Sequence, residues 1–353
     1  MKFRVICKAF SMSILLILSV SVNHCSVSDE QYLDRLFADY YGENVPGAAV
    51  MIVKNGKIFL TKTYGMADLE KHVPVTCNSN FRLASVSKQF TAMSIMLLEE
   101  SGKLDYNQTL TDIFPEFPDY GQTITIEYLL QHRSGLIDYE DLIPDTATIQ
   151  VLDRDVLQMM MQLDSTYFTP GAEFRYSNSG YAVLAMIVEK LSGKRYASFL
   201  HDEIFQLLSM DNSIAFENGI STVRNRTFGY FVESDSVLFS DQSITSAVLG
   251  DGGIYTSLND LYKWDQALYT ERLVHKKNLK AAFTPVLENY GFGWRIDNYK
   301  GHRRVHHTGS TCGFRNVIQR YPQDQFTVVI LTNRREPDVA ALADKLVDRF
   351  LLK

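Results

Sequence analysis

AAVMIVKNGKIFL, residues 48–60, has the pattern of a β-hairpin. Ala48–Val53 are all apolar, which is typical of a strand that is covered on both faces. Asn55-Gly56 suits the tight turn of a hairpin, because such a turn needs residues that tolerate positive φ. The apolar residues at 58–60 then begin the return strand. The stretch therefore predicts an antiparallel pair of strands near the start of the fold.

Short strands return in the last part of the chain. They are expected at 292–296, 304–307, 316–320 and 326–332, separated by residues typical of turns. Apolar residues at helical spacing predict a helix over 29–38, before the hairpin, and another over 339–351, after the last strand. Because strands lie at both ends of the chain, we expect one antiparallel sheet built from both termini and flanked by terminal helices.

The middle of the chain has the helical period. Helices are expected over 85–100, which Gly102 would end, and over 126–131, 154–163, 181–191 and 196–208. We therefore predict an α/β (α+β) fold over 29–353, with a helical lobe inserted at about 85–245. A cleft between sheet and lobe is a place where ligand sites often lie.

The composition is that of an ordinary globular protein. The chain has 353 residues, of which 46% are hydrophobic and 22% are charged. Its net charge of −6 argues against a nucleic-acid partner. Nothing in the sequence decides the oligomeric state.

The N-terminal residues have the features of a targeting segment. Lys2, Arg4 and Lys8 precede a short apolar run at 14–18, and small residues follow it. This pattern predicts a signal peptide over 1–28 and export to the periplasm or the medium, without stable membrane insertion of the mature chain.

Two alternatives to cleavage remain. The segment stays attached as an anchor, or Cys25 carries a lipid, although His24 before it suits lipid modification poorly. Cys77 and Cys312 lie in the body of the chain, and two such distant thiols do not form a disulfide framework. The sequence does not decide whether they pair.

Ser85 and Lys88 are the first candidates for chemistry. At a helix start their side chains share one face, and the free N–H groups there favour a negative charge. Serine becomes a strong nucleophile when a neighbour removes its proton, and Lys88 is the candidate base. The motif is short, however, and an ordinary N-cap serine would give the same pattern.

Tyr176-Ser177-Asn178 supplies the second group of polar side chains. It follows the turn Thr169-Pro170-Gly171 and precedes a predicted helix, so it is expected on a loop that a rigid scaffold presents. The phenol of Tyr176 can relay a proton, and Asn178 can hydrogen-bond Lys88 and a substrate amide. A surface turn with a packed tyrosine is the alternative.

His307-Thr308-Gly309 ends a predicted strand. Gly309 permits close approach of another backbone or of a ligand. His307 offers a donor, and Thr308 can hydrogen-bond a substrate carboxylate. The alternative is a histidine-rich strand or a metal site, but the chain has no HExxH and no Cys/His zinc spacing, so we expect no metal.

Taken in this order, the three motifs resemble those of the penicillin-recognising serine hydrolases, which include class C β-lactamases, D-alanyl-D-alanine carboxypeptidases, and related esterases and D-aminopeptidases. Further matching stretches are 45–47, 81–85, 129–136, 170–171, 252–257 and 290–294. The resemblance implies acylation of Ser85, proton transfer by Lys88 and Tyr176, and a second oxyanion N–H from Thr311 or a close neighbour. It implies no metal and no organic cofactor.

One departure bears on the substrate. Typical class C β-lactamases have lysine where this chain has His307, and the histidine resembles the carboxypeptidases and esterases of the group. We therefore expect an exported serine hydrolase that acts on a small-molecule or short-peptide substrate, an amide or an ester such as a D-amino-acid peptide. A β-lactamase is the nearest alternative, and a penicillin-binding or scaffold protein without turnover is the alternative from another class.

Overall fold

The computed structural model describes residues 28–233, 236–336 and 338–353, so the predicted signal peptide lies outside the described residues except for Ser28. The chain divides into two compact units, with the boundary between Leu36 and Phe37. The described part of the first unit holds helix α1 (Asp29–Leu36), which matches most of the helix expected over 29–38. The second unit, Phe37–Lys353, contains every other element.

A six-stranded antiparallel sheet organises the second unit, in the order β10-β11-β12-β13-β1-β2. The strands are β1 (Ala48–Lys54), β2 (Lys57–Tyr64), β10 (Arg295–Tyr299), β11 (His302–Thr311), β12 (Phe314–Tyr321) and β13 (Phe326–Thr332). β1 pairs with β2 and also with β13, where Ala48 opposes Thr332. The predicted fold class is therefore confirmed, because strands from the two ends of the chain meet in one sheet.

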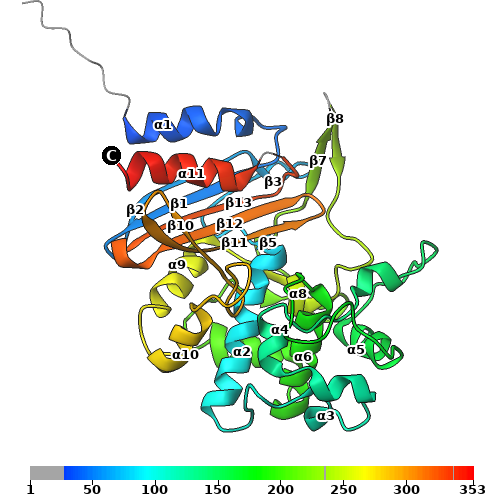
Figure 1. Ribbon diagram of the computed structural model, residues 1–353. Helices are drawn as coiled ribbons and strands as arrows, with labels where there is room; N and C mark the ends of the chain where they lie inside the picture. The colour runs from blue at the N-terminus through cyan, green and yellow to red at the C-terminus, as the bar shows by residue number, and fades with distance from the viewer. Residues whose placement is uncertain (1–27, 234–235, 337) are drawn as a thin grey trace, which may run out of the picture. The chain divides into compact units, whose positions relative to one another are not determined.

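Helices cover both faces of this sheet (Figure 1). α11 (Val339–Phe350) packs on β12 and β13, and α9 (Leu258–Ala267) packs on β1 and β13 from the other face. β1 and β13 are buried along nearly their whole length, as their continuous apolar sequences require.

The helical lobe lies beyond α9 and is centred on α2 and α6 (Figure 1). Its helices are α2 (Lys88–Glu100), α3 (Leu110–Ile113), α4 (Ile126–Leu130), α5 (Asp153–Met161), α6 (Asn178–Ser192), α7 (Tyr196–Leu200) and α8 (Leu249–Gly252), and α10 (Lys276–Ala282) follows α9. A π-helical turn over His201–Phe205 continues α7. No helix among the described residues is both long and apolar enough to cross a membrane.

Three small β-structures accompany the large sheet. They are the three-stranded sheet β5 (Phe81–Arg82), β9 (Ile254–Thr256) and β6 (Ile214–Ala215), the pair β3 (Met66–Asp68) and β4 (Val73–Pro74), and the hairpin β7 (Tyr230–Glu233) and β8 (Ser236–Phe239). β5 leads directly into the turn that precedes α2, so this small sheet anchors the start of that helix. Cys77 and Cys312 are both free thiols.

Two predicted boundaries need correction. The strand expected at 292–296 begins only at Arg295. Gly293 has φ +76, which is not a strand conformation, and it packs closely against the backbone of Lys88. The helix expected from Ser85 is α-helical only from Lys88, because a 3-10 turn over Ala84–Ser87 precedes it.

Candidate active site

Ser85 lies on the 3-10 turn that connects β5 to α2. Ala84 before it has φ +51, a left-handed conformation that costs energy for a residue with a side chain. Side chains three residues apart are eclipsed in a 3-10 turn. Lys88 Nζ consequently lies 3.2 Å from Ser85 Oγ. The turn thus holds the candidate nucleophile directly against the candidate base.

Lys88 is completely buried. Besides Ser85 Oγ, its Nζ donates to Asn178 Oδ1 at 2.9 Å and to the backbone carbonyl of Asp251 at 2.9 Å. An ammonium group has three donors, so these three acceptors satisfy all of them. Nζ also lies 4.9 Å from the ring centre of Tyr176. This set of contacts fixes the direction in which Nζ points toward the serine.

Tyr176 is half-buried beside Lys88 and is supported by His132. The two rings are 4.2 Å apart between centres. His132 is fully buried, and its Nδ1 accepts the backbone N–H of Ser177 at 3.1 Å. Burial and the charge of Lys88 hold the pKa of His132 well below its usual value, so the imidazole is neutral. His132 therefore positions the Tyr176 loop without carrying a charge.

Asn178 is the first residue of α6. Ser177 caps this helix, because its Oγ accepts the N–H of Gly180 at 3.0 Å. The side chain of Asn178 faces two ways: Oδ1 accepts from Lys88, and Nδ2 donates to Glu140 Oε1 at 3.1 Å. The Ser177 cap thus fixes the start of α6 and, with it, the position of Asn178, which links Lys88 to Glu140.

The edge of β11 forms one wall of the site. Within the described residues β10 pairs only with 302–306, so the stretch from His307 onward is a free strand edge beside the Ser85 turn. A Cβ at Gly309 would collide with the carbonyl of Leu83, which is why glycine is needed at this close approach. Ser310 and Thr311 line the same pocket as Ser85. The expected second oxyanion N–H thus has two candidates, Ser310 and Thr311.

His307 lies behind this wall instead of facing the pocket. It is 2% exposed; its Nδ1 lies 2.7 Å from the carbonyl oxygen of Thr308, and its Nε2 lies 3.0 Å from Tyr290 Oη. Burial lowers the pKa of His307 to about 3. The neutral ring therefore donates from Nδ1 to the Thr308 carbonyl and accepts at Nε2 from Tyr290, so its donor is already used within the protein. Thr308 lines a different hollow, beside Arg335 and Val339.

The pocket at Ser85 also contains side chains that the motifs did not indicate: Tyr139, Glu140 and Asp251. Tyr139 donates its hydroxyl to Asp251 Oδ2 at 3.0 Å. Burial raises the pKa of Asp251 to about 6, and burial together with Asp138 raises the pKa of Glu140. Of these three residues, only Asp251 stands out in the sequence, as a carboxylate inside the glycine-rich stretch 250–253.

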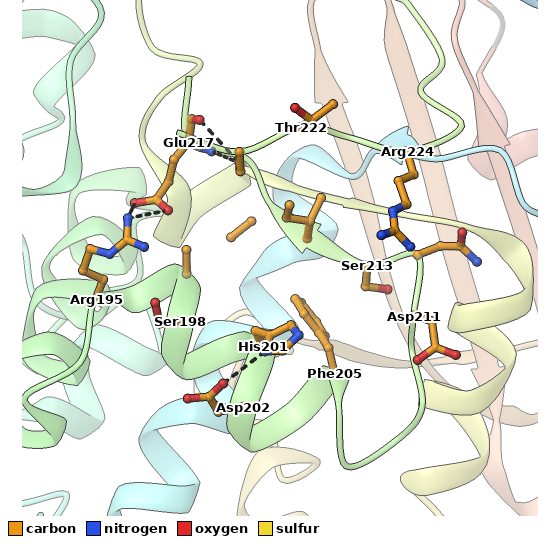
Figure 2. Close-up of a pocket in the computed structure, with 15 residues that line it drawn as sticks. Arg195, Ser198, His201, Asp202, Phe205, Asp211, Ser213, Glu217, Thr222 and Arg224 are labelled. Atoms are coloured by element: carbon orange, nitrogen blue, oxygen red, sulfur yellow. Dashed lines mark hydrogen bonds and ion pairs between the residues drawn. The ribbon is translucent and has the colours of Figure 1, made fainter. Parts of the chain in front are cut away.

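Larger hollows lie elsewhere but contain no comparable chemistry. Figure 2 shows one of about 460 Å³ beside α7. Arg195 Nη1 donates to both carboxylate oxygens of Glu217 there, and His201 Nδ1 lies 3.0 Å from Asp202 Oδ1. Ser213 in this hollow donates its hydroxyl to the buried carboxylate of Asp260 at 2.9 Å, but no lysine among the described residues bonds to it as Lys88 bonds to Ser85. No group of three or more His, Cys, Asp or Glu side chains in the described ranges is placed to hold a metal ion.

The chain is similar to known proteins over nearly its whole length. The model of a family described as Beta-lactamase matches residues 33–352. Penicillin-binding protein 4* of Bacillus subtilis (strain 168) is 34% identical over 329 residues, which cover 87% of this chain and 72% of that protein. A solved penicillin-binding protein from Bacillus halodurans is 26% identical, with a TM-score of 0.76, and 91% of this chain and 99% of that chain are covered.

The structure of D-amino acid amidase from Ochrobactrum anthropi SV3, complexed with L-phenylalanine amide, also has a TM-score of 0.76. Its identity is 22%, with 90% of this chain and 99% of that chain covered. At this identity the likeness establishes a shared fold.

Proposed function

The chain belongs to the beta-lactamase family of serine hydrolases, and on that premise we propose that it cleaves an amide or an ester through an acyl-enzyme on Ser85. The observation that carries the proposal is the 3.2 Å contact between Lys88 Nζ and Ser85 Oγ, made by a buried lysine whose other partners fix its direction. Lys88 is buried and is therefore not a solvated surface cation, and its Nζ lies within proton-transfer distance of Ser85 Oγ.

In the proposed reaction, Lys88 in its neutral form accepts the proton of Ser85, and Oγ attacks the carbonyl carbon of the substrate. The N–H of Ser85 and an N–H at Ser310 or Thr311 stabilise the negative oxygen. Tyr176 passes a proton to the leaving group, and the bond to that group breaks. Water then attacks the ester and gives a proton to the Tyr176 oxygen, the bond between the acyl carbon and Ser85 Oγ breaks, and Lys88 returns its proton to Oγ as the acid leaves.

The proposed substrate is a small molecule or a short peptide, of the class of D-amino-acid peptides and esters. The names of the relatives, a penicillin-binding protein and a D-amino acid amidase, support this class. A β-lactam resembles such a peptide, so we expect it to acylate Ser85 but to leave slowly. Among the described residues of the pocket, no group beyond those already named is dedicated to activating the hydrolytic water.

We also propose that the protein is exported. The basic residues Lys2, Arg4 and Lys8 and the apolar run at 14–18 support a cleaved signal peptide. Mass analysis of the mature N-terminus from the native host would test it, because an uncleaved Met1 or a lipid on Cys25 would each contradict cleavage near residue 28.

Intact-mass spectrometry tests the acyl-enzyme directly. The protein is incubated with a penicillin, a D-Ala-D-Ala peptide and a p-nitrophenyl ester, and the wild type should gain one acyl adduct from at least one of them. Ser85→Ala should gain none and should lose up to about a millionfold in turnover. Ser94→Ala is the matched control, since the hydroxyl of this buried serine on α2 donates to the carbonyl of Phe90, within its own helix.

The outcomes separate the alternatives. Rapid penicillin turnover without an adduct would identify a β-lactamase, and a stable penicilloyl adduct without turnover of any substrate would identify a penicillin-binding protein. Hydrolysis that persists in a folded Ser85→Ala variant would refute the assignment of the nucleophile.

A further inference from the structure

Two carboxylates face the Ser85 pocket, and the proposed reaction uses neither. Glu140 and Asp251 both line it. Glu140 is exposed, whereas Asp251 is 8% exposed. Tyr139 donates to Asp251 Oδ2, but Oδ1 has no hydrogen-bond partner in the part of the chain that the structure describes. Asp251 as a residue is more than nine-tenths buried, and a carboxylate oxygen left without a partner at a pocket can accept a hydrogen bond from a ligand.

Glu140 also changes what Asn178 offers to a substrate. Nδ2 of this asparagine donates one of its two N–H groups to Glu140 Oε1 at 3.1 Å, so Glu140 takes up one donor that could otherwise reach a substrate carbonyl. Carboxylate oxygens only accept hydrogen bonds. This wall of the pocket therefore adds acceptors and negative charge beside the remaining N–H of Asn178.

The cations nearby do not neutralise this wall by direct contact. Lys88 uses its three donors on Ser85, Asn178 and the backbone of Asp251. Arg82 also lines the pocket but is 2% exposed, and its Nη2 donates to the carbonyl of Ser246 at 2.7 Å. Its Nε and Nη1 have no partner among the described residues, so a carboxylate is the competing ligand that a test must include.

The pocket lies on the acyl side of the reaction. Tyr176, the proposed proton donor to the leaving group, is not among the described residues that line it, whereas Ser85, Ser310 and Thr311 are. A group in this pocket therefore belongs to the part of the substrate that stays on Ser85.

We propose that Glu140, together with Asp251, forms a subsite for an ammonium group on the acyl part of the substrate. The inference rests on the proposed function and narrows it: the enzyme acts on amides or esters of amino acids or peptides whose amino group is free. An N-acylated substrate would place an uncharged amide against two carboxylates.

Binding of matched boronic acids tests the subsite without requiring turnover. Boron accepts the oxygen of Ser85 and forms a tetrahedral adduct, so the rest of the molecule occupies the acyl side. 1-Aminoethylboronic acid and isopropylboronic acid differ only in an ammonium group replacing a methyl group, and 3-boronopropionic acid supplies a carboxylate. Dissociation constants are measured by calorimetry at pH 7.5, with both enantiomers of the amino compound.

We expect the better enantiomer of the amino compound to bind about tenfold to a hundredfold more tightly than the isopropyl compound, as for a hydrogen bond to a charged group. Glu140→Gln retains an oxygen for Asn178 but removes the charge, and it should reduce this ratio about tenfold. Asp141→Asn is the control: this exposed carboxylate accepts from Tyr167 and should leave the ratio unchanged. Asp251→Asn should also reduce the ratio between the affinities of the amino and isopropyl compounds, independently of Glu140→Gln.

Equal binding of the two compounds, preference for the carboxylate, or an unchanged ratio in both pocket variants would each overturn the subsite. Failure of the proposed function would look different. In that case p-nitrophenyl acetate hydrolysis would be absent from the wild type or would persist in Ser85→Ala, whatever the boronic acids show.

Discussion

Replacing Gly293 by alanine is expected to damage catalysis from outside the three motifs. Gly293 has φ +76, and a Cβ built there would lie 2.7 Å from the carbonyl oxygen of Lys88 and 3.0 Å from Gln89 Cα. Ordinary contact begins at 3.4 Å, so the two backbones must separate by about 0.7 Å. The segment around Gly293 therefore presses directly on the residue that carries the candidate base.

The effect has two parts. The left-handed conformation costs an alanine about 1–2 kcal/mol, and overpacking a close contact costs about 1–3 kcal/mol more. A shift of 0.7 Å passed to Lys88 Nζ would lengthen its 3.2 Å contact with Ser85 beyond the range of a hydrogen bond. Since a misplacement of about 1 Å costs about a hundredfold in rate, we expect Gly293→Ala to lower kcat/KM by about tenfold to a hundredfold.

Gly193→Ala isolates the conformational part. Gly193 ends α6 with φ +71, and nothing lies within 4 Å of a Cβ built there. It should lose about 1–2 kcal/mol of unfolding free energy and no activity. Urea unfolding and ester hydrolysis would be measured on both variants. If Gly293→Ala folds and keeps wild-type kcat/KM, or if Gly193→Ala loses as much activity, the contact with Lys88 does not control the site.

Two further predictions concern the motif residues. Lys88→Ala and Tyr176→Phe should each lower kcat far more than they raise KM. The double variant should be little less active than the worse single variant, because the two residues serve one proton transfer. Strictly additive losses in steady-state kinetics would show that the two residues act separately. The pKa of His307 is about 3 in the folded protein and about 6.5 in an unfolded chain. The stability that comes from burying the neutral imidazole is therefore present above pH 6.5 and is lost as the pH falls toward 3. Between pH 7 and pH 4 the melting temperature should therefore fall further for the wild type than for His307→Gln, and parallel curves would contradict a buried neutral imidazole.

Local sequence was sufficient for the elements of the sheet. Ala48–Val53 and Phe326–Thr332 are continuous apolar runs, and burial on both faces leaves just such a pattern. Asn55-Gly56 marked the turn, where Asn55 has φ +51 and Gly56 φ +71. The spacing of Ser85 and Lys88 also indicated a shared face, because that relation depends only on the nearest turn of backbone.

The boundaries around the site were less predictable. An α-helix and a 3-10 turn need the same kinds of residue, so the sequence did not show that α2 begins at Lys88 and leaves Ser85 on the tighter turn. Ala84 has φ +51 and lies close to Gly309 of β11, which is far away in the chain: a Cβ built on Gly309 would lie 3.3 Å from the Cβ of Ala84. Such strain arises from long-range contacts and leaves no local pattern.

The sequence by itself thus determined which segments form strands and helices, and which residue types are available for acyl transfer. Only the tertiary structure decided that Asp251 supplies the third acceptor of Lys88, that Glu140 meets Asn178, and that His307 is turned away behind Tyr290. Periodicity along a chain records whether a side chain is buried, because burial repeats with the helix or the strand. Which buried or polar groups meet is set by how distant elements pack, and Lys88 and Asp251 are 163 residues apart in the chain.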